Sequence, residues 1–171
     1  KLSECYNLTK IASPTENSFK NITRFGDVFE YCESLENIPE DLFANCPNVT
    51  EFYRTFSGCT SLEIIPENLF ANCPNVESFA YTFSGCTSLE RIPENLFTNC
   101  PNVTEFSDTF SGCTNLKGNA IPLWERVEGY EELDFENDVE WWGTIPDGDG
   151  CYADCEGLND YENIPAYWKR V

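Results

Sequence analysis

The chain of 171 residues lacks histidine and methionine altogether, and its ten basic side chains are outnumbered by thirty acidic ones. Without histidine, the Ser-His and Cys-His nucleophile pairs, the usual general base near neutral pH and every histidine-containing zinc site are excluded. A formal net charge of -20 opposes binding to nucleic acid and to anionic membrane surfaces. We therefore predict no nucleic-acid partner, no metal or cofactor, and no enzymatic activity.

Long apolar runs are missing as well. No stretch approaches eighteen consecutive apolar residues, and no charged and then apolar leader opens the sequence, which predicts neither membrane insertion nor a signal peptide. The lack of methionine predicts a processed chain or an excised domain. Yet 41% of the residues are hydrophobic and 15% are aromatic, which is enough to fill the core of one domain.

Cysteine, by contrast, is abundant and regularly spaced. Two series keep a period of 27 residues, namely Cys5, Cys32, Cys59, Cys86 and Cys113 in the first and Cys46, Cys73 and Cys100 in the second. The repeated unit reads GCTSLExIPENLFxNCPNVxxFxxTFS, so leucine, proline and phenylalanine recur at fixed positions too. A fixed period of this length is typical of solenoids, whose coils bury their apolar side chains only against neighbouring coils.

We predict one α+β repeat solenoid over residues 1–171, built from about six stacked coils of short strands and short helical turns. Residues 1–31 form a divergent N-terminal coil, residues 32–113 form three regular coils, and residues 114–171 form atypical C-terminal coils or a cap. All four tryptophans of the chain fall in this last segment. Their bulk suits a cap, because the terminal units of a stack have to cover the end of its core. The tryptophans are Trp124, Trp141, Trp142 and Trp168.

Each regular coil is expected to contain two strands and two helical turns. In the coil that we use as the example, the strands are 61–66 and 75–80 and the helical turns are 66–73 and 82–86. Stacking would pair each strand with its copy in the next coil, about 4.8 Å away along the axis. Near the C-terminus, residues 152–158 repeat the pattern of residues 56–62, which predicts that the register resumes there.

The repeat resembles that of a known family. Residues 48–62, NVTEFYRTFSGCTSL, and residues 102–116, in which Asn115 replaces a serine, are similar to the repeat of BspA-like leucine-rich-repeat bacterial surface proteins. The resemblance covers residues 1–122, and residues 151–168 more loosely. It implies a leucine-rich-repeat-like solenoid, an extracellular location on the bacterial cell surface, and recognition or adhesion. Similar repeats in phage and prophage tail proteins imply a virion tail as the alternative location.

Positions that differ between the copies are expected to point outward, since core positions contact identical neighbours. One such column is Lys10, Asn37, Ile64 and Arg91, and the other consists of the pairs 26–27, 53–54, 80–81 and 107–108. Tyrosine and arginine are enriched in binding hot spots. We predict that a ligand-binding face is formed by Tyr53, Arg54, Tyr81, Arg91 and Asp108, and random drift at the surface is the alternative.

The cysteines are interpreted as buried free thiols, because copies on adjacent coils lie too far apart for a disulfide and in a row that suits no metal cluster. Cys151 and Cys155 depart from the period, and a disulfide between them is the alternative. A column of asparagines is expected to satisfy backbone groups at a corner of each coil. It comprises Asn21, Asn48, Asn75 and Asn102; Asn7, Asn21, Asn48 and Asn102 also begin N-x-Thr glycosylation sequons.

Three weaker hypotheses concern the C-terminal segment. Asp147, Asp149, Asp154 and Glu156 offer oxygen ligands for calcium, although Gly-Asp runs are also ordinary turns. The acidic run 125–140 offers carboxylates for catalysis, although solvated acidic faces are common. Aromatic side chains there could stack on sugars or fill a cap. They are Tyr130, Trp141, Trp142, Tyr152, Tyr161 and Tyr167.

Taken together, the sequence predicts an extracellular recognition or adhesion module. Its partner would be a host, matrix or cell-surface protein or glycan, bound through a surface that the repeats build together. The alternative is a structural building block of a surface appendage, fibre or phage tail, which would assemble with copies of itself. A carbohydrate-degrading enzyme is a third and less favoured hypothesis.

Overall fold

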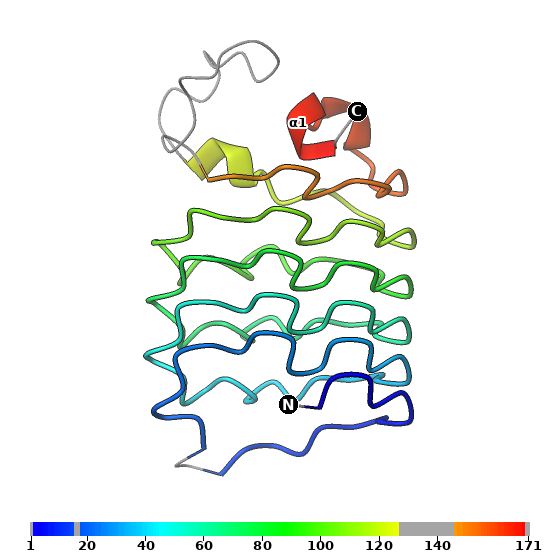
Figure 1. Ribbon diagram of the computed structural model, residues 1–171. Coiled ribbons are helices and arrows are strands. Elements are labelled where there is room, and N and C mark those ends of the chain that lie inside the picture. Colours follow the sequence, from blue (N-terminus) through cyan, green and yellow to red (C-terminus); the bar gives the residue numbers. More distant parts are fainter. Residues whose placement is uncertain (1, 16–17, 127–145, 170–171) are drawn as a thin grey trace.

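The protein is described by a computed structural model over residues 2–15, 18–126 and 146–169. Successive turns of the chain lie on top of one another, and the C-terminal helix α1 lies at one end of the stack (Figure 1). Parallel β-bridges join neighbouring coils at two columns on each coil. One column contains Lys10, Asn37, Ile64 and Arg91, and the other contains Arg24, Glu51, Ser78, Glu105 and Asp147. The 27-residue period of the sequence is thus the period at which coils stack.

The expected strands and helical turns within the coils are wrong. Within 61–66 and 75–80 only Ile64 and Ser78 pair, as isolated bridges, and the chain in 66–73 and 82–86 forms hydrogen-bonded turns. The reason is that successive backbone amides alternate between two kinds of hydrogen-bond partner. The alternation is clearest in residues 52–59, which follow the bridge residue Glu51. There the amides of residues 52, 54, 56 and 58 donate to the next coil, whereas those of residues 55, 57 and 59 donate three residues back. This pattern satisfies the backbone without an extended strand or a helix.

Among the described residues, helices occur only near the C-terminus. Two 3-10 helices, η1 (Leu123–Arg126) and η4 (Tyr161–Asn163), precede the short α-helix α1 (Ala166–Lys169). Helix α1 follows Pro165, whose fixed φ angle suits the start of a helix. None of the helices in the described ranges is long and apolar enough to cross a membrane.

The core consists of three columns of stacked aromatic rings that run along the axis. Adjacent rings in a column lie 5.4 to 6.1 Å apart between centroids, with interplanar angles of 4° to 13°. Because every ring stacks on the ring of the next coil, burial depends on the neighbours rather than on the coil itself. The columns are Phe29, Phe56, Phe83, Phe110 and Tyr152; Phe25, Phe52, Phe79 and Phe106; and Phe43, Phe70 and Phe97.

All ten cysteines are free, as predicted for the two series, and the alternative of a disulfide between Cys151 and Cys155 is wrong. The thiols do more than fill space, since Cys59, Cys86 and Cys113 donate to backbone carbonyls of the preceding coil at 3.1 to 3.3 Å. Cys155 does the same at 3.1 Å, to the carbonyl of Phe110. It is therefore the next member of that column and not half of a local bridge.

The C-terminal coil confirms the predicted match between residues 152–158 and 56–62. Tyr152 continues the phenylalanine column by stacking on Phe110 at 5.8 Å. The bridge from Glu105 to Asp147 spans 42 residues, 15 more than one period, so this coil contains an insertion. Above it, Trp124 and Trp168 meet edge to face at 5.7 Å, and Trp168 is fully buried. Trp141 and Trp142 lie outside the described residues.

Candidate functional site

Three of the predicted site residues form one cluster, which we call the tyrosine–arginine cluster (Tyr53, Arg54 and Tyr81). The guanidinium carbon of Arg54 lies 5.1 Å from the ring centroid of Tyr53 and 5.0 Å from that of Tyr81. The two rings are 5.9 Å apart and nearly perpendicular, at 72°. Such cation–π contacts hold the arginine in place while its edge stays accessible. The sequence predicted the residues, and the structure adds that they touch across two coils.

The charge of Arg54 is partly balanced by Glu30. The two side chains form an ion pair of 3.7 Å, in which Arg54 is 40% exposed and Glu30 is 15% exposed. The guanidinium has five N–H donors in a planar fork, and its side chain makes no hydrogen bond to the described residues. The cluster thus presents a positioned donor group beside two aromatic faces. That combination suits a ligand with hydrogen-bond acceptors and a flat apolar surface.

The backbone at this corner is left-handed, although glycine is absent from it. Asp27, Arg54, Tyr81 and Asp108 have φ angles of 52° to 57°. A second left-handed column uses glycine in the regular coils, at Gly58, Gly85 and Gly112. A non-glycine residue in this conformation costs about 1–2 kcal/mol. The first column thus has no glycine, whereas the second has glycine in the regular coils and Glu4, Tyr31 and Asp154 in the coils at either end.

Arg91 and Asp108 are not part of the cluster. Arg91 is exposed and belongs to the other bridge column, next to Ile64, about half a coil away along the chain. Asp108 follows Tyr81 by one period but is only 2% exposed, so it offers almost no surface to a ligand. The first variable column points outward as predicted, whereas the second does so only in part, since Ala80 is also buried.

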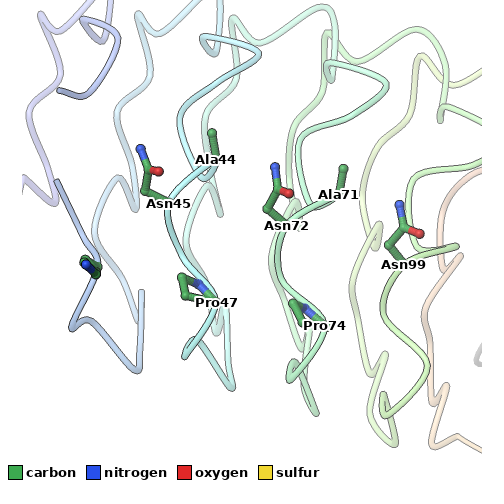
Figure 2. A pocket seen from close by; sticks show the side chains of 8 residues that line it. Ala44, Asn45, Pro47, Ala71, Asn72, Pro74 and Asn99 are labelled. Atoms are coloured by element: carbon green, nitrogen blue, oxygen red, sulfur yellow. The ribbon is translucent and has the colours of Figure 1, made fainter. Parts of the chain in front are cut away.

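The structure also contains a groove that the sequence did not predict. A groove of about 590 Å³, which we call the amide groove, is lined by Ala44, Asn45, Pro47, Ala71, Asn72, Pro74 and Asn99, with Lys20 at one end. Figure 2 shows the amides of Asn45, Asn72 and Asn99 in a row, one from each coil and pointing the same way. The ligand-binding face was predicted only from positions that vary between copies. Asn45, Asn72 and Asn99 recur at the 27-residue period as well, and a constant polar residue was the signal for the groove.

The predicted asparagine ladder is confirmed for three members, and it lies beside the groove. Asn48, Asn75 and Asn102 donate to the backbone carbonyls of Lys20, Pro47 and Pro74 in the preceding coil, at 2.8 to 3.1 Å. These bonds tie each coil to its neighbour. They are made three residues after the groove asparagines, so one type of side chain serves two different places in each coil.

The hypotheses for the C-terminal segment find less support. The Asp147 carboxylate accepts from the Tyr167 hydroxyl at 2.8 Å and from the Asp149 amide at 3.1 Å, as in an ordinary turn. Over the described ranges no cluster of three or more acidic or cysteine side chains is placed to hold a metal ion. Tyr152 is fully buried and is therefore no sugar platform. Tyr130 and most of the acidic run 125–140 lie outside the described residues.

A comparison with protein families decides what kind of chain this is. The model described as the BspA type leucine rich repeat region matches residues 2–121 in six copies. The chain belongs to the BspA-type leucine-rich-repeat family. The resemblance inferred from residues 48–62 is thereby confirmed, and so is the leucine-rich-repeat fold. A comparison with curated proteins finds no match.

Solved structures that are similar to this BspA-type chain include other leucine-rich-repeat proteins. A leucine rich cell surface protein from Faecalibacterium prausnitzii A2-165 is 28% identical over 53% of this chain and 21% of its own, with a TM-score of 0.33. A leucine-rich repeat protein from Bacteroides ovatus ATCC 8483 is 25% identical over 68% and 32%, with a TM-score of 0.36. The APL1 leucine-rich repeat domain is 20% identical over 60% and 24%, with a TM-score of 0.43. The chain thus spans less than a third of each of these proteins.

Proposed function

We propose that the chain is a recognition module on the outside of a bacterial cell, which binds a protein or glycan without chemically changing it. Its membership of the BspA-type family supports this function, because stacked repeats build extended surfaces that such proteins use for binding. The cell surface location is supported by the name of the Faecalibacterium protein. A location on a virion tail has no counterpart among the structures named above.

The tyrosine–arginine cluster is the proposed binding surface. The observation that carries the proposal is the position of the Arg54 guanidinium carbon, 5.1 Å from the ring centroid of Tyr53 and 5.0 Å from that of Tyr81. These contacts join two coils and hold a donor group beside two aromatic rings at a half-exposed corner. The left-handed backbone of Arg54 and Tyr81 is shared by Asp27 and Asp108, so it belongs to the corner and not to the cluster alone. Tyrosine and arginine are among the residues that are enriched at binding hot spots.

An array of glycans and of host matrix proteins would test the proposal. The wild-type chain should bind a member of the array, and a Tyr53→Ala, Arg54→Ala, Tyr81→Ala variant should bind it at least tenfold more weakly, because the donor fork and both aromatic faces are lost. Arg91→Ala is the matched control, since it removes a cation from the other column. Unchanged binding by the triple variant would exclude the cluster as the binding surface.

Self-association is a second candidate, favoured by the first coil. Four of the five exposed large apolar side chains among the described residues lie there, namely Leu2, Tyr6, Ile22 and Tyr31. Residues 1–31 carry four basic and four acidic side chains, whereas the rest of the chain carries the whole net charge of -20. Two copies would therefore repel each other least at these ends. Light scattering should show a dimer that a Tyr6→Lys, Ile22→Lys variant does not form; a monomer at all concentrations would exclude this candidate.

A further inference from the structure

Two asparagine columns lie three residues apart in each regular coil, and only one of them has a role inside the chain. Asn48, Asn75 and Asn102 bond to the preceding coil, as described above. Asn45, Asn72 and Asn99 make no side-chain hydrogen bond to the described residues, although the same residue recurs in all three coils. The recurrence of these three amides is therefore not explained by stacking, and their donors and acceptors are available to a ligand.

These unbonded amides lie along a hollow that crosses the coils. The amide groove runs past Asn45, Asn72 and Asn99, and a neighbouring hollow of about 500 Å³ shares Ala44, Ala71 and Asn72 with it. The two hollows are thus continuous. Alanine precedes two of the amides, at Ala44 and Ala71 (Figure 2), and its short side chain leaves room for a ligand beside them. The shape favours a long ligand that lies parallel to the axis of the stack.

The charge of the groove favours a neutral ligand. Apart from Lys20 at one end, its lining is alanine, proline and asparagine. The neighbouring hollow adds the carboxylates of Glu40 and Asp41, and the chain as a whole carries -20. A polyanion would therefore be repelled over a long range. Polar but uncharged groups, such as hydroxyls, match the donors and acceptors of the amides.

The spacing of the amides suits a linear ligand with a short repeat. Phe43, Phe70 and Phe97 precede the three amides by two residues, and their rings stack at 5.8 and 6.1 Å from coil to coil. One pyranose residue of an extended β-1,4-linked sugar chain advances by a similar distance. Alternate residues turn opposite edges to the surface, and an amide can meet either edge because it carries both a donor and an acceptor.

We propose that the amide groove binds a neutral, extended β-linked polysaccharide along the axis of the stack, with one sugar residue at each amide. Each asparagine would donate from its nitrogen to one hydroxyl and accept at its oxygen from a neighbouring hydroxyl. This inference rests on the proposed recognition function and names a ligand class for a second surface, separate from the tyrosine–arginine cluster. Affinity should rise with chain length, since each coil adds one contact.

Isothermal titration with cellohexaose, xylohexaose and chitohexaose tests the inference, with the corresponding disaccharides and heparin for comparison. At least one hexasaccharide should bind, the matching disaccharide should bind at least tenfold more weakly, and heparin should not compete.

An Asn45→Ala, Asn72→Ala, Asn99→Ala variant should bind that hexasaccharide at least tenfold more weakly than the wild type does. It should keep the urea midpoint of the wild type, since these amides make no bond to the described residues. Asn37→Ala is the matched control, an exposed asparagine in the other column, and it should bind as the wild type does.

The outcomes separate this inference from the proposed function. If no hexasaccharide binds, or if the triple asparagine variant binds as the wild type does, the inference is wrong. Array binding that depends on Tyr53, Arg54 and Tyr81 would in that case still support the recognition function. If the asparagine variant loses the hexasaccharide while the tyrosine–arginine variant keeps it, the groove is a binding surface of its own.

Discussion

The first coil and the middle coils have the same pattern of residues but very different surroundings. Cys5 and Leu8 occupy the positions of Cys59 and Leu62, yet the first pair is partly exposed and the second is fully buried. The difference is that the middle coils are covered on both sides, whereas only one neighbouring coil covers residues 2–31 in the structure. In this fold, a side chain is therefore buried by its neighbours in the stack and not by its own coil.

Alkaline pH should produce the largest contrast, because the middle coils depend on thiols that stay neutral. Burial raises the pKa of Cys46 to about 11 and the pKa of Cys59 and Cys100 to about 12, from an ordinary value of 9.0. Burial also raises the pKa of six more thiols. These are Cys32, Cys73, Cys86, Cys113, Cys151 and Cys155. Above pH 9 the unfolded chain loses these protons first, so stability is complete below pH 9 and falls as the pH rises toward the folded values.

We expect this effect to be comparable to the stability of an ordinary domain. Each thiol contributes up to about 1.4 kcal/mol per pH unit, so nine of them together lower the free energy of unfolding by on the order of 10 kcal/mol between pH 9 and pH 10. Urea unfolding at pH 8, 9, 9.5 and 10, in reductant, measures the loss. A thiol reagent at pH 8 should modify Cys5 and spare Cys59. Stability that does not change up to pH 10 would contradict the prediction.

A matched pair of leucines tests the same contrast by packing alone. Leu62 is 0% exposed, and Leu62→Ala should cost about 3 kcal/mol, since it leaves a cavity that the stacked coils cannot close. Leu8, its counterpart in the first coil, is partly exposed, and Leu8→Ala should cost about 1 kcal/mol. The free energy of unfolding in urea checks both values. Equal losses would mean that the first coil is covered in solution as completely as the middle coils are.

The sequence predicted the stack and its period, because the columns of Cys59 and Phe56 must recur wherever coils repeat. It also predicted the ladder of Asn75, whose amide has an obvious backbone partner once coils are stacked. It failed at the strands, since residue preferences do not show that alternate amides bond within and between coils. It also missed the left-handed backbone at Arg54 and Tyr81, for which only glycine would have been a signal.

The candidate site was predictable only where a position varies between copies. Tyr53, Arg54 and Tyr81 vary and lie together, as contacts across adjacent coils allow. Arg91 varies too, but it belongs to the bridge column of Ile64 and not to the one beside Tyr53 and Arg54. Which bridge column adjoins a variable position was not evident from the sequence. The asparagines of the amide groove do not vary, and a constant residue in a repeat looks like a core residue until its exposure is known.

The smallest predicted effect compares the glycine column of the middle coils with its continuation in the first coil. Gly85 has a φ angle of 71°, and a Cβ atom there would meet the Cα of Gly58 at an ordinary 3.8 Å. Gly85→Ala should therefore cost about 1 kcal/mol from backbone strain alone. Glu4 occupies the same left-handed corner with a φ angle of 61°, and Glu4→Gly should instead stabilise the chain by about 0.5 kcal/mol. The gain is smaller because glycine also raises the conformational entropy of the unfolded chain, which favours unfolding. Opposite signs in urea unfolding would show that one backbone geometry extends through both regions; if both substitutions destabilised the protein, the first coil would not share it.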